Sequence, residues 1–215
     1  MSKFIVIEGL DGSGKSTQAR RLAEFFASRG NPCFATRQPS DDRIGSLARE
    51  ATYGVFPAEN ETLSLLFAAE HYQHYCGKIA PALARGETVI CDRYYYSNFV
   101  YQGVDAPTLE RVFAYNYAVM AARTPDMVIF IDVEPEECMR RINANREQIS
   151  IFETLEKLQT QRKRFLSLFE RICDKENIII IETENADENT VFEKILNKVK
   201  VLGSVAPESP LSCTS

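Results

Sequence analysis

Short apolar segments alternate with longer amphipathic segments along this chain. The short ones are four or five residues long and mostly apolar throughout, which is typical of strands whose two faces are both covered in a parallel sheet. In the longer ones, apolar residues recur at helical spacing. The predicted strands are Phe4–Ile7, Cys33–Thr36, Thr88–Cys91, Met127–Ile131 and Ile178–Ile181. The predicted helices cover about residues 15–29, 61–85, 109–123, 136–143, 152–175 and 188–201, with a bend expected near Pro81.

This alternation of strands and helices predicts an α/β fold. We expect a three-layer, doubly wound domain around a parallel five-stranded sheet, formed by residues 1–203. Such domains bind ligands at the carboxyl ends of their strands, but the pattern does not reveal the order of the strands. Residues 204–215 have the composition of a disordered tail.

Composition excludes several functional classes. With 215 residues the chain can bury a core without disulfides, and no apolar stretch approaches the length of a membrane span. Glu8 and Asp11 would interrupt any signal peptide at the start. The net charge of −5 argues against a protein that binds nucleic acid by bulk electrostatics, so any anion must be met by a local cluster of positive charge.

The six cysteines do not have the spacing of a zinc site or a redox motif. Cys91 lies in an apolar segment, and Cys138 and Cys173 lie in helical patterns, as reduced core cysteines do. Reduced thiols indicate a cytoplasmic protein.

A glycine-rich phosphate-binding motif follows the first predicted strand. Residues 9–17 contain the pattern G-x-x-x-x-G-K-[ST] with a strand before and a helix after. The glycines let backbone N–H groups point at phosphate oxygens, and the helix adds its positive N-terminal end. Lys15 would reach the β/γ-phosphate oxygens, and the Ser16 hydroxyl would bind Mg²⁺. The residues predicted to bind a nucleoside triphosphate are Gly9, Leu10, Asp11, Gly12, Ser13, Gly14, Lys15, Ser16 and Thr17.

Charged residues follow three more predicted strands. Arg37 ends the second, Asp92 and Arg93 end the third, and Asp132 ends the fourth. Two arginines at neighbouring strand ends would form an anion site that suits the phosphate of an acceptor. A GTPase switch is disfavoured, because the D-x-x-G at Asp42 follows no strand and no complete N-K-x-D is present.

These residues resemble the thymidylate kinase family of P-loop nucleoside monophosphate kinases. The shared features are the acidic residue Asp11 in the phosphate loop, a T-R-x-P turn at 36–39, an L-L-F-A-A helix at 65–69, and D-R-Y followed by S-N and Y-Q-G at 92–103. The resemblance covers the chain apart from its tail. It implies that the γ-phosphoryl group of ATP is transferred to dTMP, giving dTDP, in a homodimer.

The resemblance also implies a role for each matching position. Arg37 and Arg93 would hold the acceptor phosphate, with Asp11 beside the acceptor sugar and Asp92 near Mg²⁺. Phe67 would stack on thymine, Asn98 and Gln102 would read its edge, and Tyr101 would crowd the ribose 2′ position. The implied catalytic residues are Lys15, Arg93, Asp11, Arg146 and Arg141. The implied metal residues are Ser16 and Asp92, and the implied acceptor-binding residues are Arg37, Pro39, Phe67, His71, Arg93, Ser97, Asn98, Tyr101 and Gln102.

The sequence departs from the family pattern at two places. His71 stands where the family has an arginine that donates to thymine, so His71 either donates one hydrogen bond to the base or fills a core position, as Phe67 could also do. This keeps open another deoxynucleotide or nucleoside as acceptor. Gly12 stands where some members carry an arginine, which predicts that a lid at about 140–152 supplies the cation, from Arg146 or else Arg141, with Arg140 facing outward. An ATP-binding regulatory module without turnover is the rival from another class.

Overall fold

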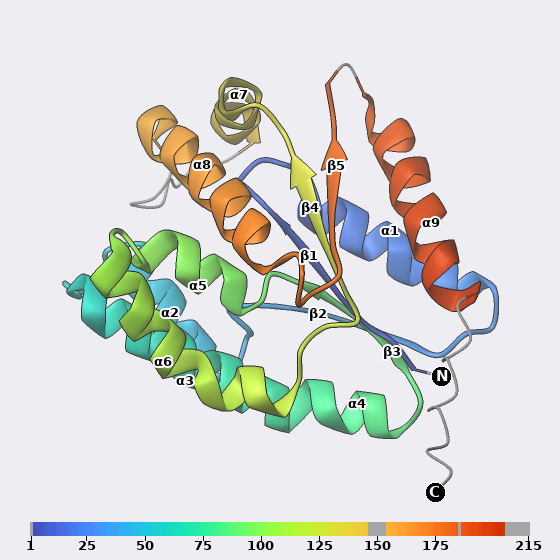
Figure 1. The fold of residues 1–215 in the computed structure, drawn as a ribbon, viewed down its shortest axis with the longest axis horizontal. Coiled ribbons are helices and arrows are strands. Elements are labelled where there is room, and N and C mark those ends of the chain that lie inside the picture. Colours follow the sequence, from blue (N-terminus) through green and yellow to red (C-terminus); the bar gives the residue numbers. More distant parts are fainter. Residues whose placement is uncertain (1, 146–153, 185, 205–215) are drawn as a thin grey trace, which may run out of the picture.

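A five-stranded parallel sheet forms the middle layer of the structure (Figure 1). The computed structural model describes residues 2–145, 154–184 and 186–204. The strand order is β2-β3-β1-β4-β5, and every neighbouring pair is parallel. The predicted fold class is therefore confirmed. The strands are β1 (Phe4–Gly9), β2 (Cys33–Arg37), β3 (Thr88–Asp92), β4 (Met127–Asp132) and β5 (Ile178–Glu182).

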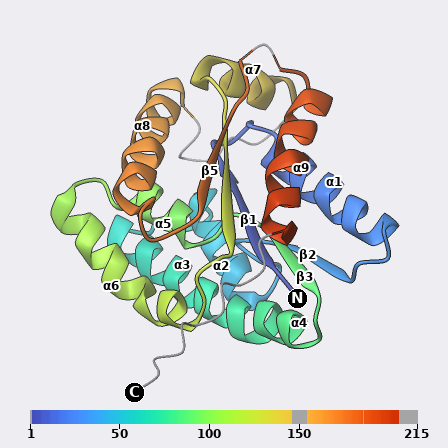
Figure 2. The same cartoon turned by 45° about the vertical axis from the view of Figure 1, so that its right-hand side comes forward.

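Helices cover both faces of this sheet. α1 (Lys15–Ser28) and α9 (Glu188–Ser204) lie on one face, and most of the other helices lie on the opposite face (Figure 2). The central strand β1 is fully buried, whereas the edge strands β2 and β5 are only partly covered. The other helices are α2 (Arg43–Thr52), α3 (Asn60–His74), α4 (Ala80–Ala84), α5 (Tyr95–Gln102), α6 (Ala106–Ala122), α7 (Pro135–Asn145) and α8 (Leu155–Ile172).

The helices differ from the predictions in three places. α2 was not predicted, because its buried residues are the small Gly45, Ala48 and Ala51, which give a weak apolar pattern. α5 was not predicted either, because its aromatic-rich sequence has no clear helical stripe. The predicted helix 61–85 is divided by a π-helical segment, Tyr75–Ile79, where the Ala80 N–H donates to the Tyr75 carbonyl. The irregular turn thus lies just before Pro81.

The cysteines are free thiols in the part of the chain that the structure describes. Cys91 and Cys138 are buried, as predicted, but Cys173 is exposed because it caps the C-terminal end of α8. Helix α9 continues through Ser204, so the first residue of the predicted tail is helical, and residues 205–215 lie outside the described chain. None of the described helices is both long and apolar enough to cross a membrane.

A buried carboxylate joins α3 to the loop after β2. Glu70 is fully buried, and its Oε1 accepts a hydrogen bond from the Ser40 backbone N–H at 2.8 Å. Its Oε2 is buried without a hydrogen-bond partner. Burial raises the pKa of Glu70 to about 7. The folded chain therefore binds a proton here at pH values where an exposed glutamate is already ionised.

We expect Glu70→Gln to change how stability depends on pH. A raised carboxyl pKa makes wild-type stability fall as the pH rises from about 4.5 through 7, and a neutral glutamine removes this loss. Relative to wild type, the free energy of unfolding of Glu70→Gln should therefore increase by about 2 kcal/mol between pH 5 and pH 8. Urea unfolding at both pH values measures it. The exposed Glu24→Gln on α1 is the matched control, and an equal change in both variants would contradict the prediction.

Candidate active site

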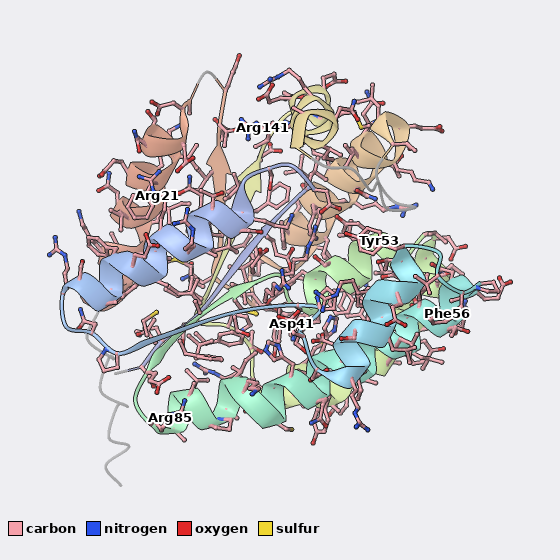
Figure 3. The ribbon with its side chains drawn as sticks, turned by 180° about the vertical axis from the view of Figure 1, so that it is seen from behind. Arg21, Asp41, Tyr53, Phe56, Arg85 and Arg141 are labelled. Atoms are coloured by element: carbon pink, nitrogen blue, oxygen red, sulfur yellow. The ribbon has the colours of Figure 1, made fainter. Side chains whose placement is uncertain are left out.

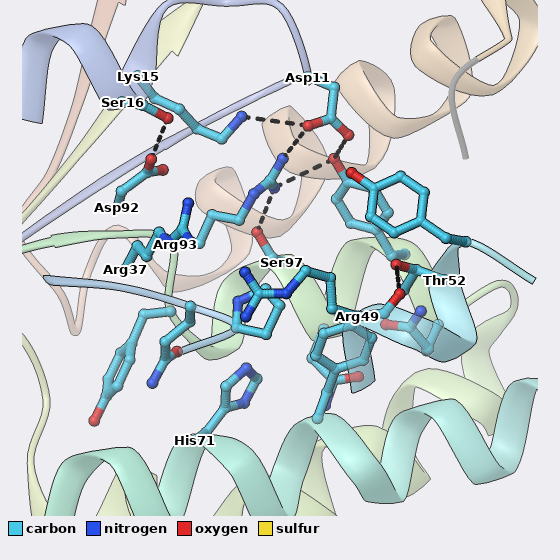
Figure 4. Close-up of a pocket in the computed structure, with 18 residues that line it drawn as sticks. Asp11, Lys15, Ser16, Arg37, Arg49, Thr52, His71, Asp92, Arg93 and Ser97 are labelled. Atoms are coloured by element: carbon cyan, nitrogen blue, oxygen red, sulfur yellow. Dashed lines mark hydrogen bonds and ion pairs between the residues drawn. The ribbon is translucent and has the colours of Figure 1, made fainter. Parts of the chain in front are cut away.

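The carboxyl ends of β1, β2 and β3 face a cavity of about 240 Å³ (Figure 4). The phosphate loop, the ends of β2 and β3, and side chains from α2, α3 and α5 form its wall. The structure brings together every residue that the resemblance implied for the acceptor. The predicted residues that line this cavity are Asp11, Lys15, Ser16, Arg37, Pro39, Phe67, His71, Asp92, Arg93, Ser97, Asn98, Tyr101 and Gln102.

The phosphate loop lies between this cavity and a second one of about 490 Å³. Gly12 and Gly14 adopt positive φ angles of 79° and 88°, which side chains rarely tolerate. Gly14 is the N-cap of α1 and has no side chain that could cap the first turn. The positive end of the helix is therefore available to an anion. The Lys15 Nζ donates to the Leu10 carbonyl at 2.9 Å and lies 3.6 Å from the Asp11 carboxylate.

Ser16 and Asp92 form a small oxygen cluster beside the loop. The Ser16 hydroxyl donates to Asp92 Oδ2, and Asp92 Oδ1 is buried without a hydrogen-bond partner. A hydroxyl and a carboxylate are hard oxygen ligands, and Mg²⁺ commonly uses one or two of them together with phosphate oxygens and water. No group of three or more potential metal-ligating side chains occurs among the described residues. The pair therefore fits an ion that nucleotide phosphates help to hold.

Arg93 is held on two sides within the acceptor cavity. Its Nη2 donates to Asp11 Oδ1 at 2.6 Å, and its Nη1 donates to the Ser97 hydroxyl at 3.0 Å and to the Tyr101 hydroxyl at 3.3 Å. The Tyr101 hydroxyl also donates to Asp11 Oδ2. These contacts orient the guanidinium toward the cavity (Figure 4).

Arg37 lines the same cavity from the end of β2, which pairs directly with β3. Its side chain is 58% exposed and donates to Asp41 at 2.8 Å. Arg49 on α2 forms an ion pair with the same carboxylate at 3.0 Å. Arg37 and Arg93 are thus at neighbouring strand ends, as predicted, although the more exposed Arg37 is held by a surface carboxylate.

Two polar side chains at the far end of the cavity have unsatisfied buried atoms. The Asn98 amide donates to the Ser64 carbonyl at 3.1 Å, which leaves its buried Oδ1 without a partner. The buried Gln102 Nε2 also has no partner. One acceptor and one donor are therefore left for a ligand in the cavity that the half-buried Phe67 also lines.

His71 is both buried and part of the cavity wall, which combines the two interpretations that the sequence left open. Asn116 donates through Nδ2 to the Val112 carbonyl, so its Oδ1 faces His71 and accepts from Nδ1 at 2.8 Å. Burial lowers the pKa of His71 to about 4, so the ring is neutral near pH 7 and its one proton is engaged by Asn116. In this arrangement Asn116 accepts that proton, so donation from His71 to a base stays a prediction.

The predicted lid is only partly within the described chain. Arg146 and most of the segment 140–152 lie outside it. Arg141, on α7, lines the second cavity, where its Nη1 donates to the Gly12 carbonyl at 3.4 Å (Figure 3). Arg140 is 70% exposed and pairs with Glu137, as expected of an outward charge.

Gly12 has no room for the arginine that some family members carry. A Cβ at this position would lie 2.5 Å from the Cys138 carbonyl oxygen of α7, and the φ angle is positive. A side chain here would require the loop or α7 to move.

Sequence reasoning missed several contributors to the site and misread one. Arg49 was missed because α2 was not predicted, and Glu8 because an apolar strand conceals a single carboxylate. The second cavity is also lined by Thr183, Ala186, Asp187, Glu188 and Val191, where the chain passes from β5 to α9. Asp132 lies in neither cavity, because it forms an ion pair with Arg162 at 2.7 Å.

The chain is similar to known proteins over most of its length. Residues 7–195 match the thymidylate kinase family. A probable thymidylate kinase of Methanococcus aeolicus is 36% identical over 201 residues, which cover 93% of this chain and 96% of the relative. Another, of Pyrococcus abyssi, is 38% identical over 203 residues, with 92% and 95% covered. A third, of Thermococcus onnurineus, is 40% identical over 178 residues, with 78% and 84% covered.

Such extensive similarity agrees with the phosphate loop, the strand order and the cavity at the ends of β1 to β3. The chain belongs to the thymidylate kinase family.

Proposed function

We propose that this protein transfers the γ-phosphoryl group of ATP to dTMP and releases dTDP and ADP. The observation that carries the proposal is that two cavities meet at the phosphate loop. Lys15 and Ser16 line both of them. One cavity therefore suits a phosphoryl donor and the other an acceptor, with the loop at their junction.

The donor cavity is suited to a triphosphate. The start of α1 and the phosphate loop offer backbone N–H groups, and the buried Lys15 adds a positive charge beside them. Ser16 and Asp92 would hold Mg²⁺. When bound, Mg²⁺ neutralises charge on the β- and γ-phosphates. The Lys15 ammonium group donates to the Leu10 carbonyl in the structure and would donate to phosphate oxygens instead when a nucleotide binds.

The acceptor cavity is suited to a nucleoside monophosphate. Arg93 and Arg37 would hold the phosphate, and Asp11 would keep Arg93 in place. At the far end, Asn98 Oδ1 would accept from the N3–H of thymine, and Gln102 Nε2 would donate to a base carbonyl. Cytosine has no hydrogen at N3, so this acceptor favours thymine over cytosine.

Transfer between the two sites needs alignment and charge neutralisation more than covalent help from the protein. Lys15 and Arg141 would face the transferring group from the donor side, and Arg93 would fix the acceptor oxygen in line. Asp11 contacts both Lys15 and Arg93, so it would couple the positions of the two cations. Arg146 remains a second candidate for the donor-side cation.

The family resemblance also supports a homodimer, and we place the protein in the cytoplasm because its core cysteines are thiols. Leu65 and Tyr72 are seven residues apart, so they share one face of α3, and they are 49% and 47% exposed. Tyr117 on the adjacent α6 is 71% exposed. Large apolar side chains exposed on two packed helices favour an interface there.

The reaction is tested by measuring ADP release with dTMP, dUMP, dCMP, dGMP, dAMP and thymidine offered singly. We expect dTMP to give the strongest stimulation. Lys15→Ala and Arg93→Ala should lower turnover by about 10³-fold with the fold intact, because each removes a cation from a phosphoryl-transfer site. Lys198→Ala on the surface of α9 is the charge-matched control. No stimulation by any acceptor would support a regulatory ATP-binding module instead.

Substitutions of two adjacent arginines distinguish a catalytic charge from a surface charge. Arg141→Ala should lower kcat by about 10²-fold, because Arg141 lines the donor cavity next to the phosphate loop. Arg140→Ala removes the same charge from an exposed position and should change kcat by less than about twofold. Steady-state kinetics with dTMP measures both. Equal effects of the two substitutions on kcat would contradict the assignment of Arg141 to the active site.

The dimer is tested by Tyr117→Glu. A charge at the centre of an apolar contact is costly to bury, so this variant should sediment as a monomer at concentrations where wild type is a dimer. Analytical ultracentrifugation measures the mass of each. The exposed Val55→Glu, located after α2, is the control and should not change the mass. A monomeric wild type would contradict the proposal directly.

A further inference from the structure

A buried carboxylate behind the acceptor cavity has no part in the reaction described so far. Glu8, near the end of β1, is fully buried and does not line either cavity. Its Oε1 accepts from the Tyr94 backbone N–H at 2.9 Å, and its Oε2 accepts from the Ser97 hydroxyl at 2.8 Å. Both donors belong to the segment that carries Arg93.

The contact with Ser97 sets the direction of a hydrogen-bond chain. A serine hydroxyl has one hydrogen to donate, and Ser97 donates it to Glu8. The Ser97 oxygen is then left with its lone pairs, which accept from Arg93 Nη1 at 3.0 Å. Asp11 holds the other nitrogen, Nη2, at 2.6 Å. The guanidinium is therefore fixed from two sides, and one side depends on Glu8.

The contact with Tyr94 holds the backbone next to Arg93. Within residues 2–145, 154–184 and 186–204, Arg93 is the one residue other than glycine with a positive φ angle, 72°. Such a conformation is strained for a residue with a side chain and persists where surrounding contacts determine it. The Arg93 N–H donates to the Ile7 carbonyl, and Glu8 receives the following N–H, so β1 holds both ends of this peptide segment.

Only a side chain with two acceptor atoms can make both contacts in this way. A glutamine has one oxygen, and the Tyr94 N–H requires it. The glutamine NH₂ would then face Ser97 and donate to the oxygen that Arg93 now uses. The hydroxyl would have to send its hydrogen elsewhere, and the support of Arg93 would weaken while the shape of the core stayed the same.

We propose that Glu8 is a positioning residue which, through Ser97 and the backbone after Arg93, holds the Arg93 guanidinium in the orientation that binds the acceptor phosphate. This rests on the proposed function, in which Arg93 binds that phosphate. Glu8 itself does not touch a substrate. Loss of the Glu8 carboxylate should therefore weaken binding of the acceptor and leave binding of ATP unchanged.

The test compares Glu8→Gln with Glu70→Gln in steady-state kinetics with dTMP and ATP. The assays are run at pH 8, because burial raises the pKa of Glu8 to about 7 and the ionised form offers the two acceptors. Glu8→Gln should raise KM for dTMP by about tenfold or more, since hydrogen bonds to charged groups are the stronger class, and should leave KM for ATP unchanged. Glu70→Gln also removes a buried carboxylate that accepts a backbone N–H, and it should leave both KM values unchanged.

Ser97→Ala and the double variant complete the test. Ser97→Ala should raise KM for dTMP in the same way, and combining it with Glu8→Gln should add little, because both substitutions break one chain of contacts. Additive effects, or equal increases in KM for dTMP and ATP, would overturn the proposal. If Glu8→Gln does not fold, an unchanged KM for dTMP in Ser97→Ala is sufficient to overturn it. A wild type that does not phosphorylate dTMP refutes the proposed function, whereas an active wild type with unaffected variants refutes only the role of Glu8.

Discussion

The site depends on the parallel pairing of β1 with β3. In this register Ile7 lies opposite Asp92, so the residues that follow each strand emerge side by side. The phosphate loop leaves β1 beside the Arg93 turn, and β2 on the other side of β3 brings Arg37 to the same edge. A donor site and an acceptor site become neighbours because the carboxyl ends of these three strands lie at the same edge of the sheet.

The same pairing explains how a chain with a net charge of −5 can hold anions. Lys15 and Arg93 are largely enclosed, and both contact Asp11, while Asp92 and Glu8 lie close by. In the structure without ligands, these carboxylates balance the buried cations and hold them in place. The charge that matters for phosphate is local and preorganised, and the acidic exterior does not oppose it at short range.

Asn98 and Gln102 on α5 contribute to the acceptor cavity differently, because the protein leaves a polar atom of each without a partner. Asn98 Oδ1 and Gln102 Nε2 are buried and unsatisfied, which is unfavourable until a ligand supplies the complementary groups. His71, in contrast, is neutral and directs its one proton to Asn116 within the protein. The side chain at the position of the family arginine is therefore engaged within the protein, whereas two polar atoms on α5 still lack partners.

Much of this protein could be predicted from local sequence alone. Apolar strand segments, the glycine spacing of the phosphate loop, and the charged residues after the second and third strands are local signals, because backbone conformation and strand burial are set largely by neighbouring residues. Three things came only from the tertiary structure. The strand order, which the sequence pattern did not reveal, placed β2 beside β3 and so brought the predicted Arg37 and Arg93 together. The unpredicted α2 added Arg49, and the Asn116 contact determined which nitrogen of His71 carries its proton. Each of these depends on residues far apart in the chain, and the Glu8–Ser97–Arg93 arrangement does too. Such contacts are decided by packing, which no short segment encodes.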